Sequence, residues 1–226
     1  MSDQSVPSGD ASVAPEQDVP LAVANDAAPA APVRKRPRPG ERRVQILQTL
    51  AAMLEQPGAE RITTAALAAR LEVSEAALYR HFASKAQMFE GLIEFIESSV
   101  FTLVNQITER EPGGAVQAQK IATMLLQFGE KNPGMVRVMV GDALVFENER
   151  LIARMNQFFD RVEGQLRQGL RNAADAGGSM TPTVDANALA SGLTAMIVGR
   201  LQRYARSGFK RSPTEHLESL LPRLTE

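Results

Sequence analysis

The sequence predicts an all-α protein, and three observations carry that prediction. From residue 40 onward, apolar residues recur at the three-to-four-residue spacing of helices. These stretches stop at breaks that contain Pro and Gly, including Pro57-Gly58 and Pro112-Gly113. No segment alternates apolar and polar residues between hairpin turns. We therefore expect an N-terminal head of three helices followed by a longer helical body.

Residues 1–39 differ in composition from everything that follows. The first 33 residues hold five acidic residues and no Lys, Arg or aromatic residue, so they cannot bury enough apolar surface to offset chain entropy. We expect a disordered acidic tail joined to a basic arm at Arg34 to Pro39. Two interpretations of the arm remain open, insertion into a DNA minor groove and a solvated linker.

Charge is distributed unevenly along the chain. The net charge is −1 overall, but residues 34–85 hold ten basic and five acidic residues. A basic segment of this kind attracts phosphates in a salt-dependent manner. A solvated run of charges is the alternative interpretation, and the motif that lies in the same segment favours nucleic-acid binding.

A bracing helix is predicted from Glu41 to Gln56, and two short helices joined by a tight turn follow it. Thr63 or Thr64 is placed to cap the first short helix and Ser74 the second, because their side-chain oxygens can accept from first-turn N–H groups. The apolar positions expected to face inward are Ala65, Leu67, Ala68, Leu71, Ala77, Leu78 and Phe82. This arrangement is typical of a helix-turn-helix.

A long helix is predicted behind the motif, from Ser84 to Glu109. Ser84 is a third cap, with Gln87 three residues later in capping-box spacing. Further helices are expected over residues 116–131, 135–146, 150–174 and 185–204. We expect a homodimer formed by the last two long helices, because small residues in the last helix allow close approach by a partner. Those small residues are Ser191, Gly192, Ala195 and Gly199.

The expected organisation is a helix-turn-helix DNA-binding domain at residues 40–86 and a helical dimerisation and partner-binding domain at residues 87–226. The stretch TTAALAARLEVSEAALYRHFASKAQMF, residues 63–89, resembles the recognition region of TetR-type regulators. The resemblance is carried by Tyr79-Arg80-His81-Phe82 and by Ser84-Lys85.

The motif predicts how the chain would contact DNA. Recognition helices of a dimer enter successive major grooves about 34 Å apart, so the expected partner is palindromic double-stranded DNA. Base edges are expected to be contacted by Ser74, Glu75 and Ala76, phosphates by Thr63, Thr64, Tyr79, His81 and Lys85, and either by Arg80. The alternatives are a capping role alone for Ser74 and plain surface exposure for His81.

Further segments are similar to the nucleoid occlusion factors. They include Arg42 to Glu55, Gly91 to Val100 and Leu125 to Leu151, and the likeness spans residues 42–222. This resemblance implies a protein that binds chromosomal palindromes. It also implies that the DNA-bound protein binds the tubulin-like division protein FtsZ and antagonises its polymerisation, which blocks septum assembly over the nucleoid.

The same resemblance implies a groove for the FtsZ tail at the junction of head and body. The residues that it places beside the tail are Phe95, Met124, Lys131 and Asn132. Core packing is the alternative for the first two, and helix C-terminal charge or capping for the other two. Leu103 and Gln127 differ from the basic and small residues expected in this groove.

Other functional classes are disfavoured by the residues present. The chain has no cysteine and only two histidines, His81 and His216, and it lacks a Gly-x-Ser-x-Gly motif and a phosphate-binding Gly-rich loop. We therefore expect no enzyme activity, no metal and no cofactor. Neither a long apolar run nor a signal sequence is present, which favours a cytoplasmic protein associated with the nucleoid.

A ligand-responsive TetR-type repressor is the alternative function. That function requires a cavity in the body, whereas we expect no small-molecule ligand. The side chains that would either fill the centre or line such a cavity are Met124, Phe128, Met155, Phe158 and Met196.

Overall fold

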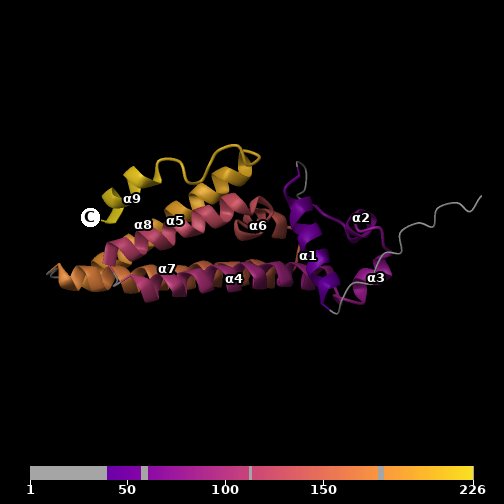
Figure 1. Cartoon of the computed structure of the whole chain (residues 1–226), viewed down its shortest axis with the longest axis horizontal. Coiled ribbons are helices and arrows are strands. Elements are labelled where there is room, and N and C mark those ends of the chain that lie inside the picture. Colours follow the sequence, from indigo (N-terminus) through magenta and orange to yellow (C-terminus); the bar gives the residue numbers. More distant parts are fainter. Residues whose placement is uncertain (1–39, 57–60, 112–113, 178–180, 226) are drawn as a thin grey trace, which may run out of the picture. The chain divides into compact units, whose positions relative to one another are not determined.

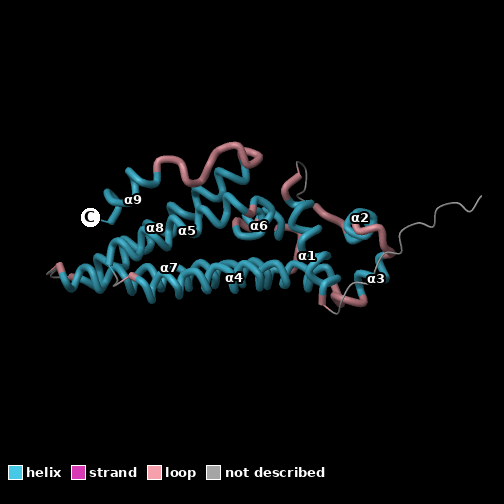
Figure 2. Tube along the Cα trace, viewed as in Figure 1, coloured by secondary structure: helices cyan, strands magenta, loops and turns pink. Residues whose placement is uncertain are grey.

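The structure is a computed structural model that describes residues 40–56, 61–111, 114–177 and 181–225. Within these ranges every regular element is a helix, which confirms the predicted all-α class (Figures 1 and 2). The elements are α1 (Glu41–Leu54), α2 (Thr64–Arg70), α3 (Glu75–Tyr79), α4 (Lys85–Arg110), α5 (Gly114–Lys131), α6 (Pro133–Met139), the 3-10 turn η1 (Asp142–Leu144), α7 (Glu149–Ala176), α8 (Pro182–Arg206) and α9 (Leu217–Thr225). The tail and arm expected at residues 1–39 lie outside the described residues.

Helix α1 joins the motif to the body. Its buried face consists of Ile46, Leu50 and Leu54, and it packs against α2, α4 and α6. The approach to α6 is so close that a Cβ on Gly134 would overlap the carbonyl oxygen of Ala51. Only glycine fits at this position, so the main chain of α6 packs directly against the main chain of α1.

The body is a bundle in which α5 lies at the centre of the packing. It contacts α4, α7, α8 and α9, and α7 also packs along α8. Figure 1 shows α4 and α7 running side by side. Phe158 of α7 is fully buried and meets Phe101 of α4 edge-on, with ring centroids 5.6 Å apart. These helices share one apolar core with the head.

Three charged contacts connect α4 with α7 and with the residues that precede α7. Lys85 forms an ion pair with Glu147, and the guanidinium of Arg150 lies 2.6 Å from the Glu90 carboxylate. Arg154 donates two hydrogen bonds to Glu97, from Nε at 3.1 Å and from Nη2 at 2.6 Å. The hydrogen bond to Glu97 raises the pKa of Arg154 above its ordinary value, against the opposing effect of burial.

The structure corrects two expectations about the helices of the body. The helix predicted over residues 135–146 ends at Met139, because Gly141 adopts a left-handed conformation with φ of 85° and η1 follows it. Helix α9 was not expected from the sequence, and it contains Pro222. Its apolar residues Leu217 and Leu221 are buried against the body, which explains how a short helix with an internal proline is held.

Candidate nucleic-acid interface

The first helix of the motif begins as the sequence predicts. Thr63 has extended backbone angles, and its hydroxyl oxygen accepts a hydrogen bond from Ala66 N at 3.1 Å. This cap satisfies one of the four N–H groups that a helix start leaves without a partner. Leu67 and Ala68 are buried as expected, whereas Ala65 is exposed, so the prediction that Ala65 faces inward is wrong. The buried face of this seven-residue helix therefore holds fewer residues than predicted.

The turn between the two short helices is closed by main-chain contacts. Glu72 takes a positive φ of 55°, which reverses the chain after α2. Val73 N then donates to Ala68 O at 3.0 Å, a hydrogen bond characteristic of a helix that ends in a left-handed residue. This turn fixes the angle at which α3 leaves α2.

Helix α3 separates a buried side from an exposed side. Leu78 and Phe82, which follows the helix, are 1% exposed. Ser74, Glu75, Ala76, Tyr79, Arg80 and His81 are all exposed. The predicted base-edge residues therefore share the solvent side of this short helix with Tyr79, Arg80 and His81.

Ser74 departs from the prediction in one respect. It occupies the N-cap position, but its hydroxyl makes no capping hydrogen bond within the described motif. The N–H of Ala77 is bound by the carbonyl oxygen of Ser74 at 2.9 Å instead. The expectation that the Ser74 side chain caps α3 is thus wrong. Helix capping therefore does not explain why this residue is a serine.

A contact between the two short helices was missed in the sequence. The Thr64 hydroxyl donates to the Glu75 carboxylate at 2.6 Å, which links the first residue of α2 to the first residue of α3. The two residues lie eleven positions apart, a spacing that corresponds to no regular helical or turn contact. Both residues are predicted to contact DNA. To reach a base or a phosphate, each must either break this hydrogen bond or contact DNA while it is still formed.

Helix α1 supports the end of α3 through an arginine. The Nη1 atom of Arg43 donates to the carbonyl oxygen of His81 at 2.8 Å, and its guanidinium lies 4.1 Å from the centre of the Phe82 ring. A carbonyl bond and a cation–π contact from one side chain hold the residues that follow α3 in place. Arg43 therefore fixes the C-terminal end of α3 from the side of α1.

Lys85 lies at the edge of this surface and has a partner in the body. Its ammonium is paired with Glu147, while Ser84 caps α4 by accepting from Gln87 N at 3.2 Å. Gln87 Oε1 in turn accepts from the N–H of Ala83 at 2.8 Å, whereas in a standard capping box this bond comes from the cap residue itself. Arg61 and Arg70 are also exposed in this segment and add positive charge, although neither was among the predicted DNA contacts.

The residues expected at the partner groove are divided between exposed and part-buried positions. Phe95 is 47% exposed on α4, so its alternative assignment to the core is wrong. Leu103 is also exposed, two turns further along the same helix. Lys131 is exposed at the end of α5, and Asn132 donates from Nδ2 to Phe128 O at 2.7 Å, which is a C-terminal capping contact.

Met124 contributes to a cleft in the body. It is part-buried and lines a cleft of about 450 Å³ between α5, the end of α4 and α9. The apolar side chains that share this cleft are Ile107, Val116, Leu217, Leu221 and Pro222. Gln127 also lines this cleft. Leu217, Leu221 and Pro222 belong to α9, so this helix, which the sequence did not predict, forms one wall of the cleft.

The fold and the exposed motif together define a helix-turn-helix DNA-binding regulator. Two family models agree with this class. The model described as bacterial regulatory proteins of the tetR family matches residues 46–92, and the tetracyclin repressor-like C-terminal domain of the SlmA-like type matches residues 114–226. Among the described residues, no helix combines the length and apolar character needed to cross a membrane.

Curated relatives cover both the motif and the body. The chain is 52% identical over 178 residues to the nucleoid occlusion factor SlmA of Photobacterium profundum, a match that spans 78% of this chain and 90% of the relative. It is 50% identical over 182 residues to the same factor of Salmonella paratyphi B, spanning 80% and 91%. The chain belongs to the SlmA family of nucleoid occlusion factors, within the TetR-type regulators.

Solved structures show the same fold at lower identity. The regulator MbdR from Azoarcus sp. CIB superposes with a TM-score of 0.67 at 19% identity, covering 81% of this chain and 96% of that one. AibR, solved in complex with isovaleryl coenzyme A and operator DNA, has a TM-score of 0.64 at 16% identity, covering 81% and 98%. At these identities the likeness establishes the TetR-type fold.

Proposed function

We propose that this chain is a nucleoid occlusion factor that couples DNA binding to the control of FtsZ assembly. It acts as a homodimer that binds palindromic chromosomal DNA in the cytoplasm and, when bound, antagonises FtsZ polymerisation so that no septum assembles over the nucleoid. The observation that carries the proposal is about 50% identity to SlmA proteins along both the motif and the body.

The DNA step is supported by the exposed side of α3. Ser74, Glu75 and Ala76 begin this helix, where side chains of a recognition helix reach base edges. Tyr79, Arg80 and His81 lie at its end, and Thr63 lies at the start of α2, positions suited to phosphates. A dimer would present two such helices to successive major grooves, so a palindromic site follows from protein symmetry.

Contacts between the predicted DNA-binding domain and the body would allow one activity to affect the other. We place the DNA-binding domain at residues 40–86 and the dimerisation and partner-binding domain at residues 87–226. Helix α4 starts at this boundary with Lys85 and runs through the body as far as Arg110. The contact between α1 and α6, together with the Lys85–Glu147 pair, provides two further links from the motif to the body.

The FtsZ step is supported by the outer faces of α4 and α5. Phe95 and Leu103 expose apolar surface on α4, Met124 enters the cleft beside α9, and Lys131 supplies an exposed positive charge. An extended peptide with apolar and acidic side chains matches this combination of contacts. Asn132 helps indirectly, because its bond to Phe128 O shapes the end of α5.

The core offers little support for the ligand-responsive alternative. Phe128, Met155 and Phe158 are buried in the continuous core, and Met196 packs against it. None of these four side chains lines the α5–α9 cleft, which is open at the surface, whereas Met124, the fifth side chain expected at a ligand site, does line it. The cleft's volume of about 450 Å³ lies within the usual range for ligand sites, so a small molecule in this cleft is the form of the alternative that the structure favours.

A two-stage binding experiment tests the proposal. Duplexes are first selected from a random pool by the full chain, and FtsZ binding is then measured with and without the selected duplex. We expect a palindrome and tighter FtsZ binding in its presence. Lys131→Glu should weaken FtsZ binding about tenfold by reversing one contact charge, while DNA affinity stays unchanged.

Lys210→Glu is the matched control, because it reverses an exposed charge on the loop after α8. We call the proposed FtsZ contacts Phe95, Leu103, Met124 and Lys131 the α4–α5 face. If both reversals weaken FtsZ binding equally, the α4–α5 face is not the docking surface. If the selected duplex has no effect on FtsZ binding in any variant, the coupling itself is refuted.

A further inference from the structure

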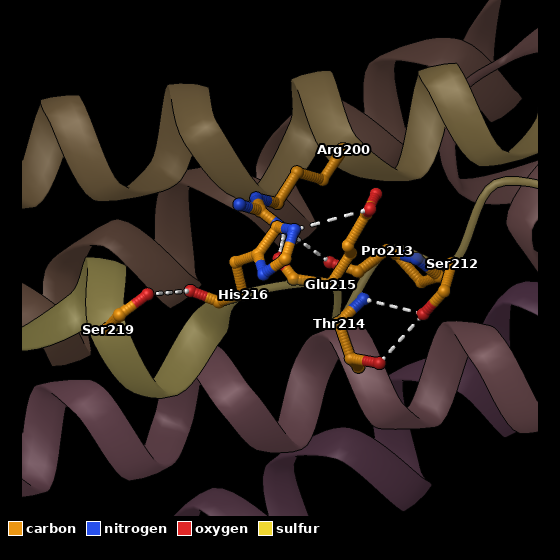
Figure 3. Close-up of polar contacts among 7 residues, drawn as sticks. All are labelled: Arg200, Ser212, Pro213, Thr214, Glu215, His216 and Ser219. Atoms are coloured by element: carbon orange, nitrogen blue, oxygen red, sulfur yellow. Dashed lines mark hydrogen bonds and ion pairs between the residues drawn. The ribbon is translucent and has the colours of Figure 1, made fainter.

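A pocket with strong positive character lies where α8 ends. Its volume is about 260 Å³, and we call it the basic pocket. Its lining consists of Arg200, Arg203, Arg211, Ser212, Glu215 and His216. These residues come from the last turns of α8 and from the loop over residues 207–216, and Figure 3 shows how part of this loop folds beside Arg200. None of them belongs to the helix-turn-helix or to the α4–α5 face.

The loop that forms the pocket is anchored from two sides. On one side the Glu130 carboxylate accepts from the hydroxyls of Ser212, at 2.5 Å, and Thr214, at 2.9 Å. On the other side Arg200 Nη1 donates to the carbonyl oxygens of Pro213, at 3.0 Å, and Glu215, at 2.7 Å (Figure 3). Because side chains of both α5 and α8 hold the loop, its backbone is preorganised and binding does not have to order it.

The backbone of the loop is constrained at both ends. Phe209 has a φ of 63° and His216 a φ of 58°, left-handed values that non-glycine residues rarely adopt. Phe209 is held by an edge-on contact with Tyr204, with centroids 5.2 Å apart, and by the Arg137 guanidinium 5.3 Å from its ring. Such conformations persist only where the surroundings determine them, and they are common at binding sites.

Positive charge in the basic pocket exceeds negative charge. Among the described residues, the guanidiniums of Arg203 and Arg211 have no carboxylate partner, and Arg200 binds main-chain carbonyls only. The single carboxylate, Glu215, lies 3.4 Å from the imidazole of His216. Three guanidiniums therefore face one acidic group. Beneath the same loop, buried Arg137 adds a further cation whose Nε finds no hydrogen-bond partner among the described residues.

We propose that the basic pocket binds the phosphoryl group of a small anion. Planar guanidiniums bind phosphate oxygens through paired N–H donors, and two that have no carboxylate partner among the described residues line one concave site here. The volume is below the range of about 300–1,000 Å³ that is usual for drug-sized ligands, which suits a phosphate or pyrophosphate group. Pyrophosphate and a DNA backbone share this chemistry, and the pocket's small volume favours the small anion.

The test is calorimetric titration of the full chain with inorganic pyrophosphate. Wild type should bind one pyrophosphate per chain, and Arg203→Gln and Arg211→Gln should each weaken binding about tenfold through loss of a charge-assisted contact. Arg206→Gln is the matched control, because Arg206 is an exposed arginine in the last turn of α8 and does not line the pocket. Its affinity for pyrophosphate should equal that of wild type.

Folding and the source of phosphate are checked on the same proteins. Arg203 and Arg211 are exposed, so their neutral variants should melt as wild type does. Their affinity for a selected DNA duplex should also be unchanged. Absence of pyrophosphate binding to wild type would overturn the proposal, as would equal weakening by Arg206→Gln. A loss of DNA affinity in Arg203→Gln without pyrophosphate binding would reassign the pocket to the DNA backbone.

Discussion

The helix-turn-helix and the loop after α8 are both short irregular segments, but contacts of different range hold them. In the motif, Thr63 caps α2 by binding Ala66, and Ser84 caps α4 by binding Gln87, each three residues further along. In the loop after α8, Glu130 binds residues 82 and 84 positions away. The helix caps of the motif are therefore made by close neighbours in sequence, whereas the loop is anchored in part by a residue of another helix.

This difference predicts how each segment responds to change. Contacts between close neighbours form together with the helix that contains them, so they persist while that helix is folded. Contacts between distant segments exist only when the body is assembled. The motif should therefore fail when its own apolar side chains are lost, whereas the loop should fail when α5 is altered.

The largest effect is expected from Phe82→Ala. Phe82 is 1% exposed and also receives the Arg43 guanidinium, so its removal leaves a cavity behind α3. The free energy of unfolding should fall by about 3–5 kcal/mol, and DNA binding should be lost with it. Denaturant unfolding and fluorescence anisotropy with a selected duplex measure the two effects.

Phe146→Ala is the matched control, because Phe146 is 69% exposed. It should change stability by about 0.5 kcal/mol or less. Equal destabilisation by the two variants would show that α3 is not held by its buried side chains.

The next effect is expected from Glu130→Ala. Two hydroxyls of the loop lose their shared acceptor, which should cost about 1–3 kcal/mol of local stability. Amides of residues 207–216 should exchange hydrogen faster, while DNA affinity stays the same. Gln127→Ala, an exposed change on the same helix, is the control. Unchanged exchange in the loop would contradict its dependence on α5.

Tyr79→Ala tests the DNA-facing side of α3. The ring is 45% exposed and contributes little to the core, so melting should be unchanged. DNA affinity should fall about tenfold through loss of a backbone contact. Tyr79→Phe distinguishes the hydroxyl from the ring. Thr63→Ala is a less specific test, because Thr63 also caps α2. Undiminished affinity in Tyr79→Ala would remove this residue from the interface.

The smallest effect is expected from Glu147→Gln, which releases Lys85 from the body. A partly exposed ion pair is worth about 0.2–1 kcal/mol, so a freed Lys85 should tighten DNA binding by about twofold to fivefold at low salt. Glu149→Gln, two residues further on, is the control. Unchanged affinity in Glu147→Gln would indicate that Lys85 serves the body and not the DNA.

Much of the fold could be predicted because caps and breaks are local signals. The starts of α2 and α4 follow from Thr63 and Ser84, whose partners lie within the first helical turn. Helix α9 was missed because Pro222 lies inside it and tertiary packing holds it. Helix α6 is shorter than predicted because Gly141 takes a left-handed conformation. The sequence alone does not reveal which glycines adopt that conformation.

The candidate sites divide in the same way. The exposed side of α3 follows from helical periodicity, so it could be predicted without knowledge of the tertiary structure. The partners of Thr64 and Lys85 could not, because eleven and 62 residues separate them from Glu75 and Glu147. The basic pocket was not found either, since its shape depends on anchoring by Glu130 from another helix.

The central claim, that DNA binding licenses control of FtsZ, is tested most directly by sedimentation. FtsZ is polymerised with GTP in the presence of the full chain, with and without a duplex selected by it, and the pelleted polymer is measured. The account predicts less polymer with the chain and a further decrease when the duplex is added, with Tyr79→Ala losing the further decrease. An equal amount of polymer under every condition would contradict it.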